Sequence, residues 1–205
     1  MTGAAAKNPP RGRPRSETAK RAILASAMEL LLDQGLSSMS MDDVARRAGV
    51  GKATIYRWWP SKERLALDAL AAEWASSASA QGRDTGTLRG DLLALLRPWV
   101  RQLKRRPYAR VVAGLVAAAQ TDAEFAELYR QHFIGPRRSA SRDLLLRARE
   151  RGQIAADTDL EVALDLLYGP VYHRLLHGHA PLTQRFAEQV IDAVITTISS
   201  DRPNA

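Results

Sequence analysis

Apolar residues in the first third of the chain recur at intervals of three and four, a spacing that indicates amphipathic α-helices. One such face is complete before residue 35 and consists of Ile23, Ala27, Leu30 and Leu31. Ser16 stands where a helix N-cap belongs and Gly35 where a C-cap belongs. The pattern therefore predicts a first helix between these two residues.

Two short helices and a longer one are predicted next. Ser40 opens the first, with an acidic residue three positions on as in a capping box, and Gly49 ends it. The second runs from Lys52 to Trp58. The third begins at Ser61, after a proline, and continues to about Ala80.

The rest of the chain is also helical in pattern. After a loop at Gln81–Thr87, the expected helices are Leu88–Lys104, Pro107–Gln120, Asp122–Phe133, Pro136–Arg151, Leu160–His177 and Thr183–Ser199. Gly135-Pro136 either kinks one long helix or splits it in two, and Gly169-Pro170 is expected to kink its helix without ending it. No segment alternates with period two, so we expect an all-α fold of nine to ten helices.

Positive charge is concentrated at the N-terminal end. The chain has 30 Lys and Arg against 22 Asp and Glu, a net charge of +8. Residues 1–64 hold 12 of these cations and 6 of the anions, so they carry most of the excess. Such asymmetry favours a polyanionic partner, of which nucleic acid is the commonest inside cells. Residues 1–15, rich in proline and arginine, are expected to form a disordered basic arm.

Composition excludes several other classes. There is no cysteine, so neither disulfides nor thiolate metal sites exist. No stretch approaches the roughly 20 apolar residues that cross a bilayer, and the N-terminus has no signal-peptide core. We therefore expect a cytoplasmic protein with no membrane partner.

The segment from Ser40 to Glu63 has the spacing of a helix-turn-helix. Ala45 is small where the second helix crosses the first, and Gly49 tolerates the positive φ of the turn. Val50 follows to fill the angle between the helices, and Ile55 is the inward residue of the second helix. The alternative interpretation is a helical hairpin with a charged surface and no DNA-binding role. The spacing, the caps and the regional charge all favour DNA binding.

The second helix of this motif carries candidate base-reading residues on its exposed side. Lys52 can donate to guanine or to phosphate, and Ala53 and Thr54 offer methyl groups to thymine. Tyr56 lies on the same side.

Residues flanking that helix suit the phosphate backbone. Arg57 and Lys62 supply cations, and Ser40 stands at a helix N-terminus whose N–H groups point toward an anion.

Residues Ser16 to Leu67 resemble the TetR family of transcriptional regulators, most specifically in the run GKATIYRWWPSKE. The resemblance implies a DNA-binding head over residues 16–63 and a helical ligand-binding and dimerisation domain over residues 64–205. Base-reading positions of the family match Lys52, Ala53, Thr54 and Tyr56, and its phosphate-contacting positions match Ser40, Arg57, Trp58 and Lys62. Trp58-Trp59 stands where many members have His-Phe, and we expect Trp59 to pack against the first helix. The runs HFIGPRR and LDLLYGPVYHRLLHG resemble an actinobacterial-type subset of the family.

The basic arm has two readings. Arg11, Arg13 and Arg15 suit the negative potential of a narrow minor groove. They also suit an untethered, solubilising tail.

The resemblance implies a ligand pocket between helices of the second domain, where the alternative is that the apolar residues form plain core. Its candidate residues are Trp99, Leu103, Val112, Val116, Phe125, Tyr129, Phe133, Tyr168 and Tyr172. The tyrosines would supply hydroxyl groups. The expected helix 136–151 carries a set of arginines that we interpret as its exposed face. They are Arg137, Arg138, Arg142, Arg147, Arg149 and Arg151.

The last two helices are expected to pair with a second copy of the chain. The candidate interface residues are Val162, Leu166, Gly169, Phe186, Val190, Val194 and Ile198. His173, His177 and His179 are grouped at the end of one of these helices, but a polar helix end is favoured over a metal site. We expect no metal and no cofactor.

The helix-turn-helix pattern and the resemblance to the TetR family together imply a ligand-responsive repressor that binds a palindromic operator as a homodimer and is released by a small-molecule effector. The alternatives are a helical enzyme or small-molecule binding protein with an incidental basic head, and an RNA-binding module. The chain has no Glu-x-x-His motif, Gly-rich phosphate loop or nucleophile elbow, so we expect no enzyme activity. A stacking sheet for RNA is also missing from the pattern.

Overall fold

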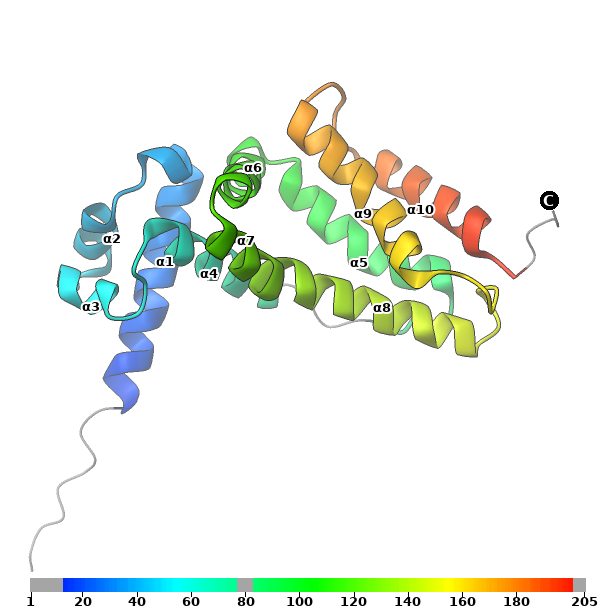
Figure 1. The fold of residues 1–205 in the computed structure, drawn as a ribbon, viewed down its shortest axis with the longest axis horizontal. Helices are drawn as coiled ribbons and strands as arrows, with labels where there is room; N and C mark the ends of the chain where they lie inside the picture. The colour runs from blue at the N-terminus through cyan, green and yellow to red at the C-terminus, as the bar shows by residue number, and fades with distance from the viewer. Residues whose placement is uncertain (1–12, 77–82, 201–205) are drawn as a thin grey trace, which may run out of the picture.

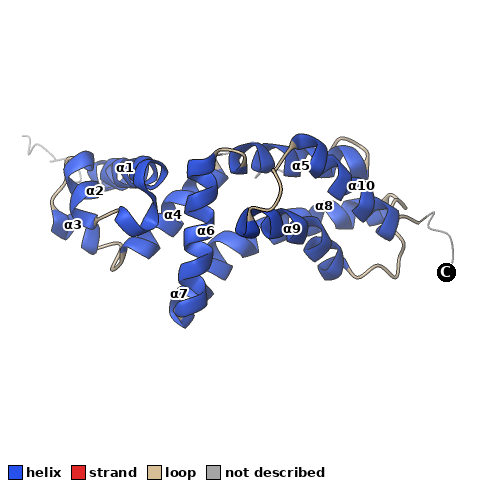
Figure 2. Cartoon of the chain, turned by 90° about the horizontal axis from the view of Figure 1, so that it is seen from above, coloured by secondary structure: helices blue, strands red, loops and turns tan. Residues whose placement is uncertain are grey.

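The computed structural model describes residues 13–76 and 83–200. Regular structure in these ranges is helical, without a strand, and an isolated antiparallel bridge joins Ile154 to Ser199. The expected all-α fold is therefore confirmed, as Figure 2 shows.

Three helices form the N-terminal head: α1 (Arg13–Ser38), α2 (Met41–Ala48) and α3 (Lys52–Tyr56). Helix α1 begins three residues before Ser16, so the arm residues Arg13 and Arg15 belong to its first turn, and Arg11 lies outside the described residues. Gly35 interrupts the helical backbone with φ 80°, at the position where the C-cap was expected.

Helix α4 (Lys62–Ala75) connects the head to the second domain. Ser61 is its N-cap and accepts a hydrogen bond from Arg64 N at 3.3 Å. The helix packs against α1 on one side and against α6 and α7 on the other (Figure 1). Its expected continuation to Ala80 falls outside the described residues.

The middle of the chain forms α5 (Leu88–Leu103), α6 (Arg106–Thr121), α7 (Ala123–Tyr129), the π-helical turn η2 (Arg130–Ile134) and α8 (Gly135–Glu150). The helical run continues from η2 into α8, so Gly135-Pro136 does not split it. Pro136 has no N–H to donate, and the Gly135 N–H bonds to Arg130 O, five residues back. The widened turn accommodates the proline within one run.

Helices α9 (Leu160–His177) and α10 (Gln184–Ile198) lie at the end of the molecule farthest from α3 (Figures 1 and 2). Pro170 lies inside α9 without ending it, as predicted. No helix in the described ranges is long and apolar enough to span a bilayer.

Candidate nucleic-acid interface and internal cavity

The junction between α2 and α3 has the geometry of a helix-turn-helix. Gly49 is in the left-handed region at φ 65°, and Val50 N donates to Ala45 O at 3.1 Å across the turn. Ala45 is buried, and Ile55 is fully buried beneath α3. Each residue occupies the role that its spacing predicted, and the remaining side of α3 is left open.

The open side of α3 presents the candidate base-reading residues. Lys52 and Ala53 are exposed, Tyr56 is 45% exposed and Thr54 is half-buried. The Lys52 ammonium lies 2.8 Å from Asp42 Oδ1 and 5.9 Å from the centre of the Tyr56 ring. The hydrogen bond to Asp42 and the negative charge of Asp42 raise the pKa of Lys52. Lys52 is therefore a positively charged group on this surface.

The two tryptophans after α3 have different environments. Trp58 is half-buried, with the Arg57 guanidinium 5.0 Å from its ring centre. Trp59 is 2% exposed, and its Nε1 donates to Asp68 Oδ2 at 2.8 Å. Trp59 is thus buried, and its polar contact is with α4. This bond joins the chain directly after α3 to the connecting helix.

Two of the expected phosphate contacts already have intramolecular partners. Ser40 Oγ accepts from Asp43 N at 3.1 Å and donates to Asp43 Oδ2 at 2.6 Å. Lys62 Nζ donates to Ser37 O at 2.9 Å, near the end of α1. A lysine has three donors, so this bond leaves Lys62 able to bind a further acceptor.

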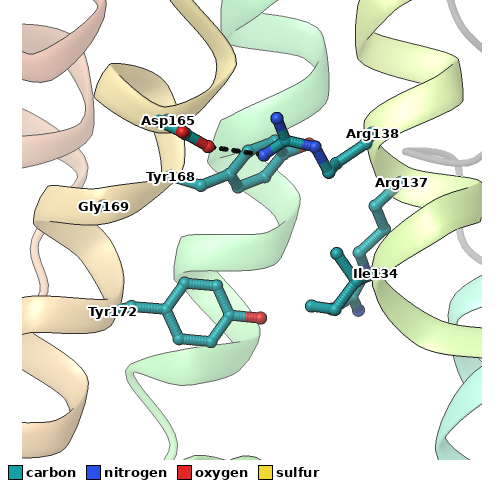
Figure 3. Close-up of a pocket in the computed structure, with 7 residues that line it drawn as sticks. All are labelled: Ile134, Arg137, Arg138, Asp165, Tyr168, Gly169 and Tyr172. Atoms are coloured by element: carbon teal, nitrogen blue, oxygen red, sulfur yellow. Dashed lines mark hydrogen bonds and ion pairs between the residues drawn. The ribbon is translucent and has the colours of Figure 1, made fainter. Parts of the chain in front are cut away.

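A cavity of about 280 Å³ lies between α8 and α9. Its lining residues, drawn in Figure 3, are Ile134, Arg137, Arg138, Asp165, Tyr168, Gly169 and Tyr172. Arg138 Nη1 donates to Asp165 Oδ1 at 2.6 Å across the two helices (Figure 3). The hydroxyls of Tyr168 and Ser141 are 2.6 Å apart.

The expected pocket residues divide into two groups. Tyr168 and Tyr172 line the cavity, and the Trp99 ring lies 5.5 Å from each of theirs. Tyr129 and Phe133 stack on one another at 5.2 Å and are buried nearby. The other group belongs to the packed core or its margin and consists of Leu103, Val112, Val116 and Phe125.

Arg137 was expected on an exposed face, and this expectation is wrong. It is 3% exposed, and its guanidinium carbon lies 3.7 Å from the ring centre of Phe133 and 4.2 Å from that of Trp74. The residues at its i+4, i+7 and i+11 positions are small or apolar and are also buried. This spacing in the sequence places Arg137 on the same helix face as these buried residues, and it was the available indication that Arg137 faces the interior. Of the other arginines in the set, Arg142 is exposed, and those half-buried are Arg138, Arg147, Arg149 and Arg151.

Three polar groups near Arg137 are buried without a well-aligned hydrogen bond. They are Trp99 Nε1, the Tyr108 hydroxyl and the Tyr129 hydroxyl. Burial raises the pKa of both Tyr108 and Tyr129, so their hydroxyls stay protonated and able to donate.

The candidate dimer residues lie along α9 and α10. Val162 is 53% and Leu166 41% exposed, and Gly169 has open space around its Cα. The remaining four are largely buried within the protomer, where α10 packs on α5, and are Phe186, Val190, Val194 and Ile198.

The three histidines at the end of α9 are close in space. The His173 ring lies 4.7 Å from that of His177 and 4.9 Å from that of His179. In the described part of the chain, no group of three or more His, Asp and Glu side chains is arranged to hold a metal ion.

Two family models match the chain. The model described as "Bacterial regulatory proteins, tetR family" matches residues 23–69, and "Tetracyclin repressor-like, C-terminal domain" matches residues 83–194. Together they cover the helix-turn-helix head and the domain that holds the cavity.

Relatives of known name are similar over most of their length. The chain is 37% identical to the HTH-type transcriptional regulator YdeS of Bacillus subtilis, over 81% of this chain and 82% of the relative. It is 34% identical to the DNA-binding transcriptional repressor TetR of Mycobacteroides abscessus, over 93% of this chain and 98% of the relative. The crystal structure of the TetR family transcription regulator SCO0332 superposes with a TM-score of 0.76 at 38% identity, covering 91% of this chain and 99% of that one.

Proposed function

The chain belongs to the TetR family of transcriptional regulators, and from this premise we propose that it is a homodimeric repressor that a small-molecule effector releases from a palindromic operator. Relatives of this kind are regulators and not enzymes, in keeping with a role on DNA in the cytoplasm. The observation that carries the proposal is the open face of α3. Ile55 anchors this helix from below, while Lys52 and Tyr56 project from the other side.

Base reading is assigned to the residues on this open face. Lys52 and Thr54 supply hydrogen-bonding groups, and Ala53 and Tyr56 supply apolar contact. The phosphates are assigned to Ser40, Arg57, Trp58 and Lys62. A five-residue α3 reads only a few base pairs, so a specific operator requires a second copy of the head.

Support for a dimer comes from the α9–α10 end. A groove of about 320 Å³ runs between these helices, with Leu166, Pro170 and Phe186 among its walls. Val162 and Leu166 leave large apolar side chains exposed beside it. A symmetric four-helix contact would cover this face twice, once on each copy. Two heads related by a two-fold axis would then read half-sites about 34–36 Å apart or somewhat further.

Release is assigned to a shift of α4. Trp74, near the end of α4, packs on Arg137 at the cavity. Near the middle of the helix, Asp68 accepts a hydrogen bond from Trp59, directly after α3. An effector that rearranges the Arg137 region would move α4 and, with it, one head relative to its twin. Affinity would fall because both heads no longer fit one operator together.

Selection of bound fragments from the source genome by the full-length protein tests this function. We expect enrichment of one palindromic sequence, protected on both half-sites in a footprint and no longer retained by Lys52→Ala. Recovery of unrelated fragments without a symmetric motif would contradict the proposal. A library of metabolites screened for release of the selected fragment then tests the effector step.

A further inference from the structure

We propose that the cavity between α8 and α9 binds a small organic carboxylate, with Arg137 as the cation that pairs with it. The inference rests on the proposed function in taking this cavity as the effector site. It adds the chemical class of the effector and the residue that recognises it.

Arg137 is a buried cation without an anionic partner. Its Nε and both Nη atoms are buried without a well-aligned hydrogen bond, the Tyr108 hydroxyl that interacts with it is neutral, and no carboxylate in the described ranges lies within ion-pair distance of its guanidinium. An arginine side chain cannot shed its proton inside a protein, so the positive charge remains. Outside the described ranges the sequence has a single acidic residue, Asp201.

The neighbouring Arg138, on the same helix, differs from Arg137 because it has carboxylate partners. It pairs with Glu161 and, at 2.6 Å, with Asp165 on α9. These carboxylates are therefore already engaged on the α9 side of the cavity. Arg137 is buried instead, and its guanidinium lies over the aromatic rings of Trp74 and Phe133.

The aromatic rings compensate Arg137 only in part. Its guanidinium lies over the faces of Phe133 and Trp74 and 5.5 Å from the Trp99 ring centre. Cation–π attraction is weaker than the hydration that a fully buried ion loses. An anion that enters beside the guanidinium supplies the missing interaction.

Neutral donors around Arg137 favour a carboxylate in particular. Trp99 Nε1 and the hydroxyls of Tyr108 and Tyr129 are buried and lack a well-aligned hydrogen bond within the protein. The Arg137 charge is close enough to lower in part the pKa of Tyr108 and Tyr129, which burial raises. A carboxylate offers two oxygens that accept from a guanidinium and from such donors together.

The rest of the cavity is suited to a compact apolar group. Tyr168 and Tyr172 line it, and the Trp99 ring lies against both. Its volume of about 280 Å³ is at the small end of the range for ligand pockets. The occupant is therefore an aryl or short-chain carboxylate.

Titration calorimetry of the full-length protein tests the assignment. The probes are phenylacetate, benzoate and hexanoate, each beside its uncharged amide, with inorganic phosphate as a separate arm. We expect at least one carboxylate to bind at least tenfold more tightly than its amide. In Arg137→Met this preference should be lost, whereas Arg142→Met, an exposed site on the same helix, should keep it.

Three results would overturn the inference. They are equal binding of each acid and its amide (including no binding of either), an undiminished preference in Arg137→Met, and Arg137-dependent binding of phosphate alone. The last would show an anion site of another class.

Thermal unfolding without ligand gives an independent readout. Removing an unpaired buried charge should raise the melting temperature of Arg137→Met by about 2–4 °C, and Arg142→Met should not rise. A melting temperature lowered by Arg137→Met would mean that the guanidinium is already satisfied, and would also overturn the inference. DNA retention is measured separately, so a protein that binds the carboxylate through Arg137 but selects no DNA contradicts only the proposed function.

Discussion

The indole N–H of Trp59 is hydrogen-bonded to Oδ2 of Asp68 at 2.8 Å, and this bond fixes the chain directly after α3 to the first half of α4. The other carboxylate oxygen of Asp68 lies 3.4 Å from His132 Nδ1 in the π-helical turn. One side chain on α4 thus contacts the DNA-binding head and the segment that leads into the cavity wall. It is a physical link between the two halves of the proposed mechanism.

Loss of the Asp68 acceptor should destabilise the head. Asp68→Ala leaves the buried Trp59 N–H without a partner, which should lower the free energy of unfolding by about 1–3 kcal/mol in urea titrations. Asp68→Asn keeps an acceptor oxygen and should cost less. In Trp59→Phe, where no N–H remains, Asp68→Ala should have a much smaller effect. Equal effects of Asp68→Ala in both backgrounds would show that the bond contributes nothing.

Lys52 and Asp42 give a pair of opposite predictions for DNA affinity. Lys52→Ala removes a base or phosphate contact and should weaken operator binding roughly 10- to 100-fold at constant salt. Asp42→Asn should strengthen binding, because it frees Lys52 from its 2.8 Å ion pair and removes a negative charge near the phosphates. Fluorescence anisotropy with a labelled operator measures both, with Arg142→Ala as the control. Unchanged affinity in Lys52→Ala would remove α3 as the recognition helix.

Local sequence signals predicted the head well because each is decided within a few residues. Gly49 was identified by the positive φ that its turn requires, and Ser40 and Ser61 by the caps that they form. Pro170 was correctly expected to lie within its helix, but the effect of Pro136 was left open between a kink and a split. Whether a proline ends a helix depends on whether the neighbouring turns find other hydrogen-bond partners for the backbone groups that the proline leaves unpaired. For Pro136, the π-helical turn at Arg130–Ile134 provides this, and it is visible only in the structure.

The cavity was predicted less well because it depends on contacts between distant helices. Tyr168 and Tyr172, named as sources of hydroxyl groups, line the cavity, but Leu103 and Val112, named with them as pocket residues, belong to the core. Arg137 was missed because arginine is usually exposed, and a prior based on residue type outweighed its helical position. Only the packing of α4 and α5 against α8 shows that this arginine is enclosed.

A substitution at Lys62 distinguishes two roles for this residue, a contact with a DNA phosphate and a structural hydrogen bond at the end of α1. If it binds phosphate, Lys62→Gln should reduce the slope of log affinity against log salt by about one unit. If it acts only through its 2.9 Å bond to Ser37 O, the slope should stay the same while stability falls by about 0.5–1.5 kcal/mol. Operator titrations at several salt concentrations, together with urea unfolding, distinguish the two. We expect the lower slope, since the bond to Ser37 uses one of three donors.

Substitution of Leu166 tests whether the α9–α10 face forms the dimer interface. It is 41% exposed beside the α9–α10 groove, so Leu166→Asp should leave the protomer folded while it disrupts the contact. We expect monomers by sedimentation and a loss of operator affinity of about 10²-fold or more, since two linked heads bind with avidity. Leu146→Asp, at an apolar site of similar exposure on α8, is the control. A Leu166→Asp dimer would place the interface elsewhere.

Asp91 should make the stability of the second domain depend on pH in acid. Its side chain has no exposed surface, and it accepts from Thr85 N at 2.6 Å, Thr85 Oγ1 at 2.7 Å and Arg151 Nη2 at 2.9 Å. Burial raises the pKa of Asp91, but the bonds from Thr85 and Arg151 outweigh it and hold the pKa below the ordinary value of 3.8.

Because the folded pKa of Asp91 is the lower one, its ionised form stabilises the fold above about pH 4 and this contribution disappears as the pH falls further. Asp91→Asn should therefore lower the free energy of unfolding by about 1–3 kcal/mol at pH 7, and the difference from wild type should shrink below pH 4. Asp192→Asn, which breaks an exposed pair with Arg89, should have a smaller effect that high salt removes. Urea unfolding from pH 7 to pH 3 measures these differences. A gap between Asp91→Asn and wild type that stays constant with pH would show that the Asp91 carboxylate does not link the Thr85 loop to α8 through its charge.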